Sequence, residues 1–96
     1  MNFRYHPEAA KELISSIEYY DDMSEGLGEE FLNEVEAAIS LLLSHPKTGT
    51  LITKEDRRIL LNRFPYGLIY DVSDEIITIN AVMHLSRRPG YWKLRK

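Results

Sequence analysis

The sequence predicts one two-layer α+β domain over residues 1–96, in which a helical hairpin packs on a mainly antiparallel sheet. Three observations lead to this prediction. A length of 96 residues suits one small domain, and the composition, 44% hydrophobic and 28% charged, is that of an ordinary globular protein. The first half of the chain repeats apolar residues with helical period. The second half changes to the alternation of strands, which predicts the order strand, helix, helix and three strands (βααβββ).

The two helices are bounded by proline and glycine. A short strand is expected at residues 3–5, and Pro7 then suits a first helical turn because its missing N–H needs no partner there. Glycines at residues 26–28 separate the helices, and Pro46 ends the second. The first apolar face is expected to comprise Ala10, Leu13, Ile14, Ile17 and Tyr20 or Asp21. The second is expected to comprise Phe31, Val35, Ala38, Ile39 and Leu42.

Three strands are expected to follow. Residues 47–56 are polar enough for a loop, and strands are predicted at 58–64, 66–72 and 76–82. Residues 73–75 form a polar turn between the last two. Short connections make these strands antiparallel neighbours, and one face of their sheet has to cover the helical hairpin. The residues expected to share a face of the middle strand are Tyr66, Leu68 and Tyr70.

Charge is divided unevenly along the chain. The formal net charge of −3 by itself argues against a nucleic-acid-binding protein. However, residues 1–46 carry 2 basic and 10 acidic side chains, a balance of −8, whereas residues 47–96 carry 10 basic and 5 acidic ones, a balance of +5. The basic half therefore predicts an acidic or phosphate-rich partner.

Several chemistries are excluded by the residues present. A chain without cysteine has no disulfide and no thiolate metal site. His6, His45 and His84 lack metal-ligand spacing, and residues 26–28 lack the third glycine of a dinucleotide fingerprint. No metal, nucleotide or organic cofactor is therefore implied. The most apolar stretch, residues 39–43, is far shorter than the roughly 20 residues of a membrane span, so we expect a cytoplasmic protein.

The candidate binding residues are concentrated at the end of the chain. Residues 84–96 combine five cations with His84 and the adjacent aromatic residues Tyr91 and Trp92. Cations attract phosphate or carboxylate, and aromatic rings stack or anchor a partner. Alternatively, the two aromatic rings pack this segment onto the domain and the cations remain solvated. The cations are Arg87, Arg88, Lys93, Arg95 and Lys96, and Arg57, Arg58 and Arg63 of the preceding strands could share their surface.

A set of short motifs in fixed order runs nearly from end to end of the chain. They are Tyr5-His6-Pro7-Glu8-Ala9, Gly26-Leu27-Gly28 with Phe31, His45-Pro46, Arg63-Phe64-Pro65-Tyr66 with Leu68-Ile69-Tyr70, Ala81-Val82 with His84, and Arg88-Pro89-Gly90-Tyr91-Trp92. In these motifs the chain resembles the RelE/ParE toxin superfamily of bacterial type II toxin–antitoxin systems. It is most similar to the ParE-type, "plasmid stabilisation" branch.

The resemblance implies a growth-inhibiting toxin that a cognate antitoxin, with an acidic or amphipathic C-terminal segment, holds inactive. Three modes of action are compatible with this resemblance. A ParE-like toxin would bind DNA gyrase without catalysing a reaction, and this is the mode we expect. A RelE-like toxin would be a ribosome-dependent mRNA endonuclease. A degenerate member would be a non-toxic binding module.

The implied site residues depend on the mode. An endonuclease would use His84, Arg87 and Tyr91 as catalytic residues. Leu85, however, stands where RelE-like enzymes tend to carry arginine, and Lys54 is a single lysine where they carry a basic pair. The residues expected to bind target or antitoxin are Arg57, Arg58, Arg63, Arg87, Arg88, Tyr91, Trp92, Lys93 and Arg95.

Overall fold

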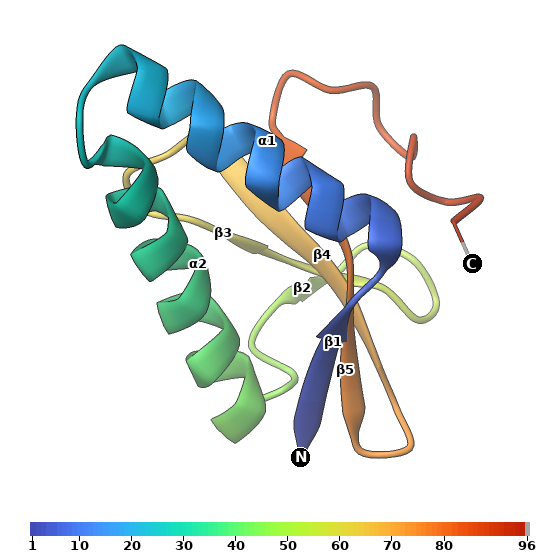
Figure 1. Ribbon diagram of the computed structural model, residues 1–96. Helices are drawn as coiled ribbons and strands as arrows, with labels where there is room; N and C mark the ends of the chain where they lie inside the picture. Colours follow the sequence, from blue (N-terminus) through green and yellow to red (C-terminus); the bar gives the residue numbers. More distant parts are fainter. Residues whose placement is uncertain (96) are drawn as a thin grey trace.

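The computed structural model describes residues 1–95 and contains two helices and five strands. Both helices lie on one face of the sheet (Figure 1), which confirms the predicted α+β architecture. Lys96, the last cation of the C-terminal segment, lies outside the described residues. The elements are β1 (Asn2–Tyr5), α1 (Pro7–Met23), α2 (Leu27–Ser44), β2 (Thr50–Leu51), β3 (Arg57–Leu60), β4 (Tyr66–Ser73) and β5 (Ile76–His84).

The strands are arranged in the order β1-β5-β4-β3-β2. The pairs from β2 to β5 are antiparallel, as predicted, whereas β1 pairs parallel to β5. The β4–β5 turn places Asp74 and Glu75 at φ 53° and 61°, the left-handed conformation that suits a tight hairpin. β1 reaches only as far as Tyr5, opposite Ile79, so it covers the first half of β5. The outer edge of the second half of β5 therefore has no strand beside it.

The helices begin and end at the predicted signals. α1 starts at Pro7, and α2 ends at Ser44, just before His45-Pro46. Between them, the backbone N–H of Gly28 donates a 2.8 Å hydrogen bond to Oδ1 of Asp21 and so satisfies a free donor of the first turn of α2. A Cβ on Gly28 would lie 2.7 Å from that same oxygen. Only glycine therefore fits where the two helices approach.

The buried face of α1 differs from the predicted one. Ala9, Leu13, Ser16 and Tyr20 are buried, whereas Ile14 is 59% exposed. Each residue turns the helix by about 100°, so the stripe that continues from Leu13 to Ser16 and Tyr20 leaves Ile14 one step outside it. For α2 the prediction is confirmed, because the residues of its buried face include Phe31, Val35, Ile39 and Leu42.

Two strand boundaries also differ from the prediction. β3 ends at Leu60 and not at Phe64, because residues 61–65 turn tightly and the Tyr66 N–H donates to the Phe64 carbonyl at 2.7 Å. Leu61 and Phe64 remain buried within this turn, so their apolar character reflects the core and not a strand. The expected loop at 47–56 contains β2, which pairs with β3.

The core lies mainly between the helices and the sheet. Tyr66, Leu68 and Tyr70 of β4 face the helices, as the alternation predicted. A smaller cluster on the opposite face, here called the open face, consists of Ile69, Ala81, Met83 and Trp92. Within residues 1–95, no helix has both the length and the apolar character needed to cross a membrane.

Candidate binding surface

The residues after β5, here called the C-terminal segment (residues 85–95), run back beside the N-terminal half of α1 (Figure 1). Trp92 is 5% exposed and packs on the open face against Ile69, Ala81 and Met83. The packing interpretation is therefore the one the structure shows for this tryptophan. Tyr91, the neighbouring residue, is partly buried against the same cluster, and its hydroxyl donates a 2.6 Å hydrogen bond to Glu12 of α1.

The Glu12 carboxylate fastens the C-terminal segment to α1. It accepts two hydrogen bonds from the Arg95 guanidinium, at 2.8 and 2.9 Å, in addition to that from Tyr91. The backbone N–H of Val82 donates a fourth at 3.0 Å, and Arg95 also donates to the Asn80 carbonyl at 2.9 Å. We call Glu12, Tyr91 and Arg95 the Glu12 clamp. It satisfies two backbone groups of β5 beyond the end of β1, the Val82 N–H and the Asn80 carbonyl.

The clamp residues change one another's ionisation. Burial alone would raise the pKa of Glu12, but the hydrogen bonds from Arg95, Tyr91 and Val82 bring it below its ordinary value. Burial, and then the bond to the Glu12 carboxylate, raises the pKa of Tyr91. Arg87 lies with its guanidinium carbon 3.9 Å from the centre of the Tyr91 ring, and its Nη1 is 3.8 Å from Glu12. Glu12 is therefore ionised at neutral pH and Tyr91 is held protonated.

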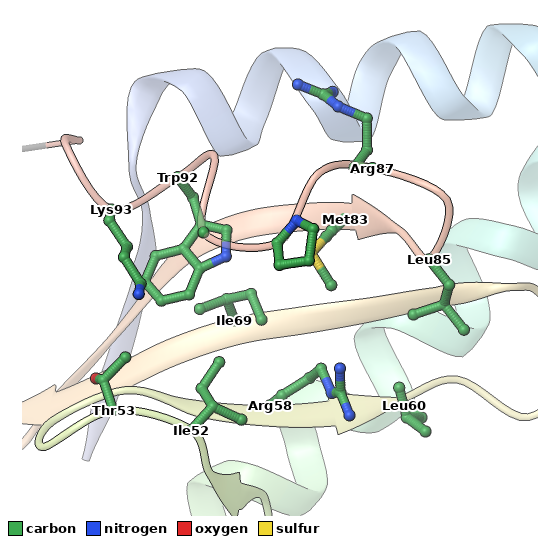
Figure 2. Close-up of a pocket in the computed structure, with 12 residues that line it drawn as sticks. Ile52, Thr53, Arg58, Leu60, Ile69, Met83, Leu85, Arg87, Trp92 and Lys93 are labelled. Atoms are coloured by element: carbon green, nitrogen blue, oxygen red, sulfur yellow. The ribbon is translucent and has the colours of Figure 1, made fainter.

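A cavity of about 400 Å³ opens on the open face (Figure 2). Ile69 and Met83 form its floor, and Trp92 and Lys93 of the C-terminal segment lie along one side. Arg58 of β3 lies across the cavity from them. We call this the open-face cavity. Its lining is Ile52, Thr53, Arg58, Leu60, Ile69, Met83, Leu85, Arg87, Pro89, Gly90, Trp92 and Lys93.

A second, polar cleft of about 450 Å³ lies between α1 and the end of β5. His84 and Arg87 line it together with Ser16. The Nδ1 atom of His84 accepts the Ser86 backbone N–H at 3.0 Å, so a neutral imidazole carries its proton on Nε2. The His84 ring packs edge-on against Tyr66, with 5.1 Å between ring centres. Arg87 lines both the open-face cavity and the polar cleft, so it lies between them.

Only part of the predicted set meets at the open-face cavity. Arg58, Arg87, Trp92 and Lys93 line it. Leu85, which stands at the position expected for arginine in a nuclease, lines it as well and contributes apolar surface. The cavity therefore combines the cations of Arg58 and Lys93 with an apolar floor. The Arg87 side chain points away from the cavity toward α1 (Figure 2), where its Nη1 lies 3.8 Å from Glu12.

The other predicted residues lie elsewhere. Arg57, next to Arg58 on β3, donates a 2.8 Å hydrogen bond to the Gly49 carbonyl. Arg63 forms a 2.8 Å ion pair with Glu30 of α2. Arg88 is exposed, and Tyr91 and Arg95 belong to the Glu12 clamp.

Glu12 was not singled out by the sequence analysis. It lies among the polar residues of an amphipathic helix, and its side-chain partners are 79 and 83 residues away along the chain. No local pattern carries that information. Within the described part of the chain, 1–95, no three histidine, aspartate or glutamate side chains gather to hold a metal ion.

Comparisons with known proteins agree with this geometry. Residues 3–89 match the family described as "ParE toxin of type II toxin-antitoxin system, parDE". A solved structure described as the "Chromosomal ParDE TA system from P. aeruginosa" has the same fold, with a TM-score of 0.75 and 16% sequence identity over 88% of this chain and 95% of that one. No curated protein sequence matches the chain. Because the family match spans most of its residues, the chain belongs to the ParE toxin family of type II toxin–antitoxin systems.

Proposed function

We propose that this protein is a growth-inhibiting toxin that acts in the cytoplasm by binding DNA gyrase and is neutralised by a cognate antitoxin. Membership of the ParE toxin family supports the toxin assignment. The observation that carries the binding mode is the open-face cavity. An apolar floor with the cations of Arg58 and Lys93 beside it suits an anchored protein segment that carries acidic residues.

The chemistry of the cavity favours binding over cleavage of RNA. Attack by a ribose 2′-hydroxyl needs a general base and an acid for the leaving oxygen. Among the described residues that line the cavity there is no histidine, aspartate, glutamate or tyrosine. His84 faces the polar cleft instead, and the Tyr91 hydroxyl is engaged with Glu12. The endonuclease mode therefore has less support.

The antitoxin is proposed to carry an acidic or amphipathic C-terminal segment that covers the same face. Leu60 and Leu85, which are 51% and 45% exposed, offer apolar contacts beside Arg58 and Lys93. A carboxylate-bearing segment with an apolar side would match both features. The helical hairpin, with an acidic first half of the chain, would repel such a segment.

Two parallel assays test the mode. Purified protein is added to gyrase and supercoiled plasmid in the presence of ATP, and linear DNA is measured after protein denaturation. The same protein is added to a cell-free translation reaction, and transcript length is measured. The proposal expects gyrase-dependent linear DNA and intact transcripts. Cleaved transcripts with no effect on gyrase would replace it with the endonuclease, and a protein inert in both assays that also permits colony formation would be a non-toxic binding module.

A charge variant ties the activity to the open-face cavity. Arg58→Gln combined with Lys93→Gln removes two cations and keeps most of each aliphatic stem, so gyrase trapping should fall strongly. Arg63→Gln combined with Lys47→Gln is the matched control, because it also removes two cations, and neither of them lines the cavity. Equal loss in both variants would show that the effect is one of total charge and not of this surface.

The antitoxin is sought in the neighbouring reading frame. Co-expression of that protein should restore colony formation, and its complex with the toxin should weaken as salt rises. The Arg58/Lys93 double variant should bind it more weakly than the Arg63/Lys47 double variant does. Unchanged binding by the Arg58/Lys93 double variant would remove the open-face cavity from the antitoxin interface.

A further inference from the structure

The C-terminal segment has two supports, and they lie on opposite sides of β5. On the open face, Trp92 packs against a cluster of only three other buried residues. On the side of α1, Tyr91 and Arg95 meet Glu12. The helices do not cover the open face, so no apolar layer supplements the contact of Trp92 there. The position of the segment consequently depends on the polar support.

Glu12 is well suited to that task. Its side chain is 15% exposed, and so is the Arg95 side chain that it binds. The pair is bidentate, and charge-assisted bonds of this geometry are the stronger and more directional ones. Without the carboxylate, a largely buried guanidinium would face no anion and the Tyr91 hydroxyl would have no acceptor.

The clamp brackets the residues that form one wall of the open-face cavity. Trp92 and Lys93 line the cavity and lie between Tyr91 and Arg95 in the chain. At the N-terminal end of this stretch Gly90 adopts φ 77°, and the Lys93 N–H donates to the Gly90 carbonyl at 3.0 Å, which closes a turn. If Tyr91 and Arg95 were both released from Glu12, Trp92 and Lys93 would no longer be held in place along the cavity. Glu12 itself does not line the cavity.

We propose that Glu12 is a positioning residue, which from helix α1 holds the C-terminal segment in the conformation that completes the open-face cavity. The inference deepens the proposed function and rests on it only in assuming that this cavity receives the partner. Glu12 does not line the cavity. It acts through Tyr91 and Arg95.

Trp92 provides a direct readout, because it is the single tryptophan of the chain. The test compares the full-length wild type with Glu12→Gln, which keeps the shape and removes the charge. Glu18→Gln is the matched control, since Glu18 is exposed on the same helix. In Glu12→Gln we expect red-shifted emission and severalfold stronger acrylamide quenching of Trp92, with unchanged far-ultraviolet circular dichroism. Glu12→Asp should restore part of the protection. Wild-type quenching in Glu12→Gln would overturn the proposal.

A milder variant covers the case in which Glu12→Gln does not fold. Tyr91→Phe removes one hydrogen bond of the clamp and leaves the pair between Glu12 and Arg95 intact. Amide hydrogen exchange should then accelerate in residues 87–95 while the amides of β4 stay protected. Equal acceleration throughout the domain would mean that the clamp contributes only to global stability, and the positioning role would be wrong.

Growth inhibition separates this inference from the proposed function. Each variant is induced without antitoxin, and colonies are counted. Glu12→Gln should lose toxicity while Glu18→Gln keeps it. If the wild type is not toxic, the proposed function fails and the quenching experiment still decides the role of Glu12. Full toxicity of a Glu12→Gln protein whose Trp92 is exposed would show that the partner does not need the clamped wall.

Discussion

On the helix side of the sheet Phe31 contacts three aromatic rings, those of Tyr20, Phe64 and Tyr66. On the open face Trp92 forms a smaller cluster with Ile69, Ala81 and Met83, and a partly buried Tyr91 packs against it. The first cluster draws on both helices and on the strand turn, so the loss of one contact leaves others in place. The second has one buried aromatic residue, Trp92, the partly buried Tyr91 beside it, and one polar clamp. We infer from this difference that the helix side provides most of the stability of the domain, while the open face has few packing contacts and remains accessible to a partner.

The largest expected effect on stability comes from removal of the Phe31 ring, at the centre of the aromatic cluster on the helix side. Phe31 is fully buried, so Phe31→Ala should lower the free energy of unfolding by about 3–5 kcal/mol through lost burial and the cavity left behind. Urea unfolding followed by circular dichroism measures it. Ile14→Ala is the control, because Ile14 is 59% exposed and its truncation should change stability by no more than about 0.5 kcal/mol. Similar losses in both variants would contradict the interpretation that Phe31 belongs to the core and Ile14 to the solvent-exposed face of α1.

The contact between the helices gives the next largest effect. Gly28→Ala introduces a Cβ that would overlap the backbone carbonyl oxygen of Ile17 and lie 2.7 Å from Asp21 Oδ1, so the helices have to separate. We expect a loss of about 1–3 kcal/mol, typical of overpacking. Thermal and urea unfolding measure it. A loss below about 0.5 kcal/mol would show that the hairpin adjusts freely at this point.

Acid should weaken the Glu12 clamp, and with it the attachment of the C-terminal segment, before it weakens the core between the helices and the sheet. The folded-state pKa of Glu12 lies below its ordinary value, so the stability it contributes is present above that ordinary value of 4.5 and is lost as the pH falls through the lowered one. Trp92 quenching in the wild type should rise over that range. In Glu12→Gln the quenching should be high already at pH 7 and change less with acid.

A flat profile in the wild type would contradict this prediction. The Glu18→Gln control should follow the wild type, because it keeps the clamp. Circular dichroism recorded on the same samples separates release of the C-terminal segment from unfolding of the domain.

The sequence predicted those parts of the fold that depend on neighbouring residues. Pro7 and the glycine pair around Leu27 locate the helix ends because their effects on the backbone are local. The alternation of Tyr66, Leu68 and Tyr70 predicted which face of β4 meets the helices. Ile14 was misplaced because two overlapping helical stripes fit the same apolar residues, and only the packing of α1 on the sheet distinguishes them.

The candidate site was predictable only in part. The basic composition of the C-terminal segment indicated a binding surface, and Arg58, Arg87 and Lys93 do line one cavity. Arg57 and Arg63 have the same charge but are directed to the Gly49 carbonyl and to Glu30. Which cations converge depends on strand register and on contacts such as that of Glu12, which no window of sequence contains.

The smallest expected effect on stability is that of the surface ion pair between Arg63 and Glu30 on the helix side. Arg63 and Glu30 form a surface ion pair whose side chains are 61% and 50% exposed, so Arg63→Ala should lower the free energy of unfolding by about 0.2–1 kcal/mol at most, and less as salt is added. Urea unfolding in low and high salt measures this difference. Growth inhibition by Arg63→Ala should equal that of the wild type, because a cation paired with α2 lies outside the open-face cavity. Loss of toxicity with stability intact would instead show that the binding surface extends to the helix side, so that the open face would not be the only binding face.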